Sequence, residues 1–349
     1  MRPSTLVSSV ALAVASVSHA DIFQYEDCDG DGSLLLTELD PLAGADLSGL
    51  YLGCANLPQE NLTGADFSKA NLISANLFNA DLALAEFVNT DLSQANLSGA
   101  FLSYAQFFYA SLTGADLSNV FGENVGLSNS VLSQANLSNA VLNSAFLVNS
   151  DLTSANLSNA HLISANLLDT NLTGANLSGA FLGGASLSGA VLTGADLRGA
   201  KLTFAFLENA DLTQANLSNV DLTNGRLRNA NLSGANLRNA DLSGADLTQA
   251  DLTGADVRGA ILSCNLTDAT LTDVIFCSES QQTGSCCLSS GCTTISDRQC
   301  TEIGGVWTEG GSCDDCSAAP ITCAADLSGD GIVGFDDLVN VISNWGVCP

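Results

Sequence analysis

The chain has 349 residues, with 37 acidic residues against 9 Lys and Arg, and its formal net charge is −28 at pH 7. Proteins that bind nucleic acid hold the phosphate backbone with a basic surface, so this balance argues against nucleic acid as a partner. It also disfavours binding to an anionic membrane surface.

Residues 1–20 are predicted to be a secretory signal peptide. They contain one arginine, an apolar run from Leu6 to Val17 and small residues up to Ala20. This order is typical of a leader that is cleaved after Ala20. An N-terminal anchor helix is the alternative, but the run is shorter than the roughly 20 residues of a membrane span. We therefore expect a bacterial protein that is secreted, periplasmic or held at the cell surface, with no integral membrane segment after the signal is removed.

Residues 21–40 carry a predicted calcium loop and cap, with DCDGDGSLLLTE at 27–38. An EF-hand loop supplies hard oxygen ligands at set positions around a glycine-permitted turn, and Gly32 stands at that turn. Pro41 follows closely, so any helix after the loop is short. Calcium is the expected cofactor, and its predicted ligands are Asp27, Asp29, Asp31, Ser33 and Glu38.

A five-residue repeat fills residues 41–276. Segments such as ADLSG, ANLTG and ADLTQ recur, and Ala usually stands two residues before each central Leu. A period of five fits neither an amphipathic helix nor a simple strand. If each pentapeptide forms one side of a coil, four of them close a square coil of twenty residues with Leu and Ala inside. From position 47 to 262 every fifth residue is Leu, except at Phe67, Phe87, Phe107, Gly122 and Val257.

This pattern resembles the pentapeptide repeat family, whose A[DN]LXX motif is met nearly throughout residues 45–262. The resemblance implies an all-β fold, a right-handed quadrilateral β-helix. This pentapeptide-repeat solenoid would have about twelve coils stacked at about 4.8 Å.

The twenty-residue coil makes specific predictions for the interior and the coil path. Phe67, Phe87 and Phe107 should stack in one interior column, because they are 20 residues apart. The glycine at position 122 predicts a local bulge. The four-residue step from Leu262 to Leu266 predicts the approach of the end of the repeats.

The same wrapping also sorts the outer surface. One column holds Arg198, Arg238 and Arg258 and lies next to that of Asp196 and Asp256, which predicts neighbouring opposite charges. Another column is apolar where most columns carry Asn or Asp, and exposed apolar patches tend to mark interaction sites. Isolated exposed rings without a function are the alternative. The candidate interaction surface consists of Phe101, Tyr104, Phe108, Tyr109, Phe121, His161 and Phe181.

Residues 277–318 are predicted to form a small disulfide-rich module. All twelve cysteines follow the leader, and an even count in an exported chain favours disulfides over a zinc site. We expect Cys323 to pair with Cys348, and Cys28 to pair with Cys54. The pairing of the other eight, which include Cys264, is left open.

Residues 319–349 are predicted to form a second calcium module. The loop DLSGDGIVGFDD at 326–337 precedes an amphipathic segment, and together they resemble half of a type I dockerin. A full dockerin has two halves, and its partner-reading Ser/Thr pair is Phe335 and Asp336 here, so the resemblance supports calcium binding more than docking to a cohesin. The predicted ligands are Asp326, Ser328, Asp330, Ile332 and Asp337.

These features favour a binding role over catalysis. After removal of the leader His161 is the only histidine, and a solenoid filled with Leu and Ala leaves no pocket for chemistry. We expect a secreted non-catalytic scaffold, calcium-stabilised at its ends, that presents an elongated face to a protein or a polysaccharide. The alternatives are an acidic DNA mimic that inhibits a topoisomerase and an accessory component of a polysaccharide-degrading system. The oligomeric state is not predicted.

Overall fold

The computed structural model describes residues 43–275 and the backbone of five short strands. The strands are β1 (Ala11–Leu12), β2 (Ile22–Phe23), β3 (Gly284–Leu288), β4 (Gly291–Ile295) and β5 (Val306–Glu309). Strands β1 and β2 pair antiparallel, and β3 lies between β4 and β5 in an antiparallel sheet. The chain divides into two compact units, Met1–Phe181 and Leu182–Pro349.

Several predicted features lie outside the described residues. They are the cleavage point of the signal peptide, the calcium ligands Asp27, Asp29, Asp31, Ser33, Glu38, Asp326, Ser328, Asp330, Ile332 and Asp337, and the cysteines Cys28, Cys323 and Cys348. They stay predictions.

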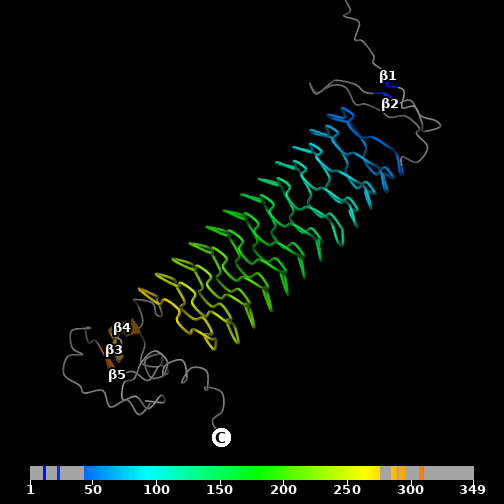
Figure 1. Cartoon of the computed structure of the whole chain (residues 1–349). Coiled ribbons are helices and arrows are strands. Elements are labelled where there is room, and N and C mark those ends of the chain that lie inside the picture. Colours follow the sequence, from blue (N-terminus) through cyan, green and yellow to red (C-terminus); the bar gives the residue numbers. More distant parts are fainter. Residues whose placement is uncertain are drawn as a thin grey trace, which may run out of the picture. The chain divides into compact units, whose positions relative to one another are not determined.

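In the first unit, residues 43–181 form a stack of four-sided coils (Figure 1). Parallel β-bridges join residues that are 20 apart, from Asp46–Asp66 to His161–Phe181. Within one coil, Phe101, Gln106, Ser111 and Asp116 each bridge to the residue 20 positions later, one from each side. The sides are single bridges rather than extended strands, so the β-helix has its coil-to-coil pairing without long β-strands.

In the second unit, residues 182–275 form the same kind of stack (Figure 1). Its parallel bridges run from Ser186–Phe206 to Asp256–Ile275.

The corners explain the period of five. Each side contributes three residues, and a two-residue turn follows it. The second turn residue has a positive φ and donates its N–H to a carbonyl of the next coil, as Gly114 does to Ser133 at 2.9 Å. Gly and Asn tolerate this left-handed conformation best, which is why they recur at the fifth place of the repeat.

Leu and Ala form the core, as predicted. The central Leu side chains and the Ala two residues before them are almost all fully buried. Phe67, Phe87 and Phe107 stack in one column with ring centroids 4.9 and 4.5 Å apart and nearly parallel planes, which confirms the predicted column. Burial of each Leu contributes about 1.5–3 kcal/mol, so the core is the main source of stability.

A column of buried hydroxyls, which the repeat pattern did not predict, replaces Ala at four places. Thr90 donates to the carbonyl of Phe67 at 2.7 Å, and Thr170 donates to that of Leu147 at 2.8 Å. These bonds satisfy hydroxyls that would otherwise be costly to bury. The four residues are Thr90, Ser130, Ser150 and Thr170.

The prediction of a local bulge at Gly122 is wrong. The bridges Phe101–Phe121 and Gln106–Gly126 keep the 20-residue register on both sides of it. A Cβ atom at position 122 would lie 2.6 Å from Cγ2 of Val125 and 2.9 Å from Cβ of Leu102. Val125 occupies the space that a central Leu would fill, so the coil keeps its path with a smaller residue.

The four-residue step after Leu262 is absorbed within the stack. Asp246 pairs with Asn265, 19 residues later, and coil pairing continues to Asp256–Ile275. Cys264 takes the place of the repeat's Ala and is buried. The shortened step therefore lies within the last described coil, close to the end of the described repeats, as predicted.

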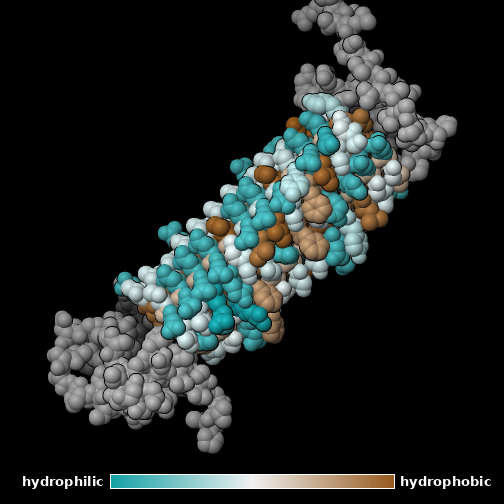
Figure 2. Space-filling model, in the orientation of Figure 1, coloured by the Kyte–Doolittle hydropathy of each residue, from teal (hydrophilic) through white to brown (hydrophobic). Residues whose placement is uncertain are grey.

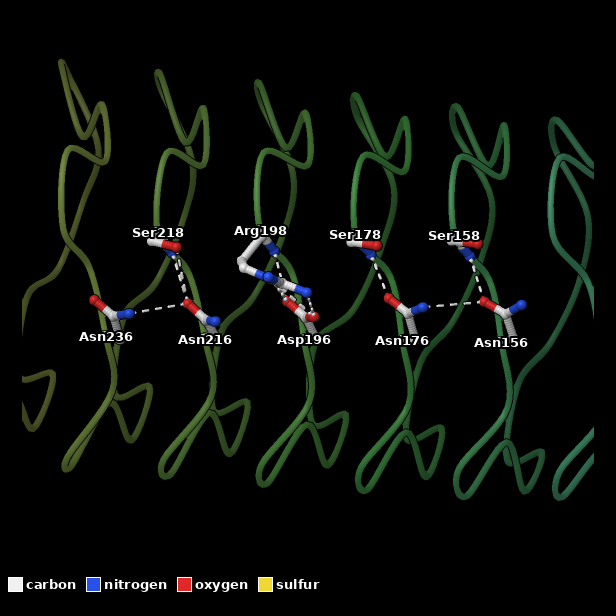
Figure 3. A network of polar contacts seen from close by, with 9 residues as sticks. All are labelled: Asn156, Ser158, Asn176, Ser178, Asp196, Arg198, Asn216, Ser218 and Asn236. Atoms are coloured by element: carbon white, nitrogen blue, oxygen red, sulfur yellow. Dashed lines mark hydrogen bonds and ion pairs between the residues drawn. The ribbon is translucent and has the colours of Figure 1, made fainter.

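One side of the first unit carries a ladder of amides (Figure 3). The Nδ2 of Asn176 donates to Oδ1 of Asn156 at 3.2 Å, and that of Asn156 donates to Asn136 at 3.1 Å. The same Oδ1 atoms accept the N–H two residues later, for example from Ser158. We call Asn56, Asn76, Asn96, Asp116, Asn136, Asn156 and Asn176 the asparagine ladder.

The second unit carries ion pairs that the column arrangement predicted. Arg198 contacts Asp196 at 2.6 Å (Figure 3), and Asp256 contacts both Arg258 at 2.5 Å and Arg238 at 3.2 Å. The hydrogen bond from Arg198 lowers the pKa of Asp196, and that from Arg258 lowers the pKa of Asp256. Such partly exposed pairs each contribute about 0–1 kcal/mol.

Candidate binding surface

The predicted apolar column lies on one side of the first unit. Parallel bridges join its members in order, from Phe101 to Phe121 and finally from His161 to Phe181. The rings of Phe101 and Phe121 meet edge to face at 6.5 Å, and those of His161 and Phe181 are tilted at 4.5 Å. We call Phe101, Phe121, Val141, His161 and Phe181 the ring column.

The ring column presents apolar surface to solvent. Phe101 is 53 % exposed and Phe121 is 45 % exposed, although their backbones are held on both sides by coil pairing. The coils fix where these rings stand, so little backbone entropy is lost when they contact a ligand.

Two tyrosines extend this surface around the coil. Tyr104 stands at the corner that follows Phe101, and Tyr109 stands one corner further on, beyond Gln106. Both have positive φ, 62° and 60°, and they are 53 % and 61 % exposed. Neither phenol hydroxyl has a hydrogen-bond partner among the described residues.

Phe108 is placed differently from these tyrosines. It is half-buried where the tyrosines are exposed, because its ring lies over Gly126 of the next coil. A Cβ atom on Gly126 would lie 2.9 Å from Cζ of Phe108 and 2.3 Å from Oε1 of Gln106. The glycine at position 126 thus makes room for both side chains, and the ring of Phe108 lies over this part of the next coil.

Leu84 is a contributor that the sequence analysis missed. It stands at the same corner as Tyr104, one coil earlier, with φ of 61° and an exposed side chain. Its N–H donates to Ser103 at 2.9 Å, the residue before Tyr104. The signal that could have found it is the apolar residue at the fifth place of ADLAL, residues 80–84, where the repeat otherwise favours Gly, Asn or Ser.

Acidic side chains border Tyr104 and Tyr109, which stand on two successive corners of one coil that we together call the tyrosine corner. Asp81 bridges to Phe101, Glu86 bridges to Gln106, and the carbonyl of Glu123 accepts the N–H of Tyr104. The surroundings are otherwise amides, hydroxyls and apolar groups. In the space-filling view, brown apolar side chains interrupt a mostly teal and white surface (Figure 2). This mixture suits a ligand without negative charge, because an anion would be repelled.

Other kinds of site have no support in the described part of the chain. Residues 43–275 contain no cluster of three or more His, Cys, Asp or Glu side chains arranged to hold a metal ion. No helical segment among the described residues has the length and hydropathy of a membrane span.

The two described cysteines of the coils differ. Cys54 is disulfide-bonded, and its predicted pairing with Cys28 stays a prediction. Cys264 is a free buried thiol, so its inclusion among the pairing cysteines is wrong. Burial raises the pKa of Cys264 to about 12, because the thiolate would be desolvated.

Comparison with known sequences identifies the family. The profile of pentapeptide repeats matches residues 42–82, 85–121, 124–159, 155–194, 190–229 and 226–263, which is more than half of the chain. The chain belongs to the pentapeptide repeat family. No curated protein sequence matches this pentapeptide repeat protein significantly.

Solved structures of pentapeptide repeat proteins are similar to it. HetL, involved in heterocyst differentiation regulation in the cyanobacterium Nostoc sp. strain PCC 7120, is 33% identical, with 66% of this chain and 90% of HetL covered and a TM-score of 0.38. A thylakoid-lumen protein of Arabidopsis thaliana is 34% identical, with 31% and 72% covered and a TM-score of 0.27. QnrB1, a plasmid-mediated fluoroquinolone resistance protein, is 22% identical, with 55% and 88% covered and a TM-score of 0.37.

Proposed function

We propose that this pentapeptide repeat protein is an exported, non-catalytic binding scaffold. The observation that carries the proposal is the ring column, in which exposed rings repeat in register on a rigid side of the first unit. Rigid, exposed aromatic side chains are the residues that most often anchor binding interfaces. The leader sequence supports an extracellular site of action.

Calcium is proposed to stabilise the ends of the repeats through the loops at 27–38 and 326–337. An open coil end exposes unpaired backbone groups, so repeat proteins need caps. Hydrogen exchange with and without a calcium chelator tests this role. Faster exchange at the terminal coils than in the middle after chelation supports it, and equal protection in both conditions refutes it.

The binding role is tested by a pull-down from the exported fraction. The double variant Phe121→Ser, Phe181→Ser removes two rings of the column without touching the core. The matched control is Tyr51→Ser, because Tyr51 is also an exposed aromatic residue but lies on another side of the coil. Loss of partners with the double variant alone supports the proposal, and unchanged capture by all three proteins refutes it.

The alternative functions predict other outcomes. An acidic DNA mimic requires a cytosolic protein with its leader uncleaved, which fractionation and mass spectrometry of the N-terminus detect. A role in a polysaccharide-degrading system through the dockerin-like module predicts capture by a cohesin, and that capture would not depend on the ring column.

A further inference from the structure

The corner residues of the described coils are under different constraints from the sides. At nearly every corner the residue with positive φ is Gly, Asn, Ser, Gln or Asp. A left-handed conformation is unfavourable for residues with large side chains, and a bulky residue there is an outlier. The bulky outliers are Lys69, Leu84, Tyr104 and Tyr109 in the first unit and Phe204 in the second, and all except Lys69 are apolar or aromatic.

Folding gains little from the four apolar or aromatic side chains among them. Their exposed fractions lie between 53 % and 61 %, so they bury little apolar area against their own chain. Residues that combine backbone strain with exposure are candidates for a functional role, because stability alone would favour Asn or Gly there.

We infer that Tyr104 and Tyr109, with Leu84 and Phe101 beside them, bind a neutral polysaccharide chain. This inference rests on the proposed binding function and assigns the class of its ligand.

The chemistry of the corner suits sugars. The face of an aromatic ring carries partial negative charge, so it attracts the C–H bonds on one face of a pyranose ring. The unpartnered hydroxyls of Tyr104 and Tyr109 can exchange hydrogen bonds with sugar hydroxyls at the rim of the same contact. Tyrosine offers both kinds of contact with few rotatable bonds, which keeps the entropic loss on binding small.

The charge around the corner selects an uncharged polymer. Asp81, Glu86 and Glu123 belong to the coil before or after the two tyrosines. Their carboxylates repel nucleic acids and polysaccharides built from uronic acids. The neighbouring Leu84 and Tyr104 occupy the same corner in successive coils, so one extended chain could contact both.

Phe204 provides a matched control. It has the same kind of corner position, a φ of 58° and an exposed ring. Its surroundings contain two positive charges. Lys201 is three residues before it in the sequence, and the guanidinium of Arg226 lies 4.9 Å from the ring centroid of the nearby Phe206. Phe204→Asn therefore relieves the same strain without altering the tyrosine corner.

Affinity electrophoresis of the full-length protein tests the inference. The gels contain hydroxyethylcellulose, mixed-linkage β-glucan or galactomannan as neutral probes and polygalacturonate as the anionic probe. We expect retardation of the wild type by at least one neutral polymer and none by polygalacturonate. Tyr104→Asn and Tyr109→Asn should each weaken binding about tenfold, whereas Phe204→Asn should leave it unchanged.

Thermal unfolding supplies the second readout. All three variants should have higher unfolding temperatures than the wild type, because Asn accepts the left-handed conformation better than Tyr or Phe. A tyrosine variant that is more stable but binds less separates contact with the ligand from a folding defect. Tyr104→Phe keeps the ring and should retain more affinity than Tyr104→Asn.

The inference is overturned if no neutral polymer retards the wild type, if polygalacturonate does so equally, or if both Tyr→Asn variants keep full affinity. Capture of a protein partner that depends on Phe121 and Phe181, with no retardation by polysaccharide, would refute this inference and leave the proposed binding function standing. Absence of both would refute the two together.

Discussion

Phe87→Ala tests whether the aromatic stack holds the first unit together. The ring of Phe87 is fully buried and is stacked on both faces, 4.9 Å from Phe67 and 4.5 Å from Phe107. Its N–H also donates to Gln106 of the next coil at 2.6 Å. The backbone around it is therefore paired and has little freedom to collapse into the space that the ring leaves.

The expected magnitude follows from this geometry. Replacing a buried Phe by Ala costs about 3–5 kcal/mol, and the cost is highest where the site cannot relax. Loss of two stacked contacts places Phe87→Ala at about 4–5 kcal/mol, toward the upper end of this range. Each coil interacts mainly with its neighbours, so the loss should appear in the transition of the coils around it.

The measurement is guanidinium unfolding followed by far-UV circular dichroism, with hydrogen exchange to locate the loosened coils. Phe101→Ala is the matched control, because the same residue type is exposed on the outside and should change the free energy of unfolding by less than about 0.5 kcal/mol. Phe87→Leu, which restores the usual residue of the repeat, should lie between. A difference under about 1 kcal/mol between Phe87→Ala and Phe101→Ala would contradict the reasoning.

Three further predictions concern single positions. Gly122→Ala should lose about 1–3 kcal/mol of stability in thermal unfolding, since its Cβ would clash with Leu102; no loss would show that the coil shifts freely. Asp256→Asn should lose about 0.5–1 kcal/mol at pH 7. Because the folded pKa of Asp256 is lowered from 3.8, that contribution is complete above pH 3.8 and is lost as pH falls through the folded value, so the variant and wild type should converge in acid; a constant difference would contradict this. Cys264 should resist iodoacetamide at pH 8 until the protein is unfolded, as measured by mass spectrometry, and rapid labelling of the native protein would refute its burial.

The sequence alone predicted the features that depend on spacing. A period of five wrapped at twenty placed Phe67, Phe87 and Phe107 in one interior column, and the structure confirms it. It also placed Phe101 and Phe121 in one outer column. A solenoid makes such predictions possible, because each coil contacts mainly the coil before and the coil after it.

The sequence did not predict features that depend on volume and backbone conformation. The bulge expected at Gly122 is absent because Val125 fills the interior from the next side, which spacing cannot reveal. The strain at Tyr104 depends on which residue of the turn takes the positive φ. Cys264 was grouped with the disulfide cysteines, but the shortened coil turns it into the core.

The asparagine ladder has a direction, and this bears on chemical ageing. In its middle, Asn136 and Asn156 each donate from Nδ2 to the coil before, while their Oδ1 atoms accept from the coil after and from the turn. Asp116 can accept from Asn136, as it does at 3.0 Å, but a carboxylate has no N–H to donate toward Asn96.

Deamidation of Asn156 would create the same situation in the middle of the ladder. The turn would keep its acceptor, but the bond to the preceding coil would be lost and a carboxylate would face the amide oxygen of Asn136. A protein molecule that ages in this way would therefore lose its coil-to-coil bonds on this side one at a time, while its repeat geometry stayed intact.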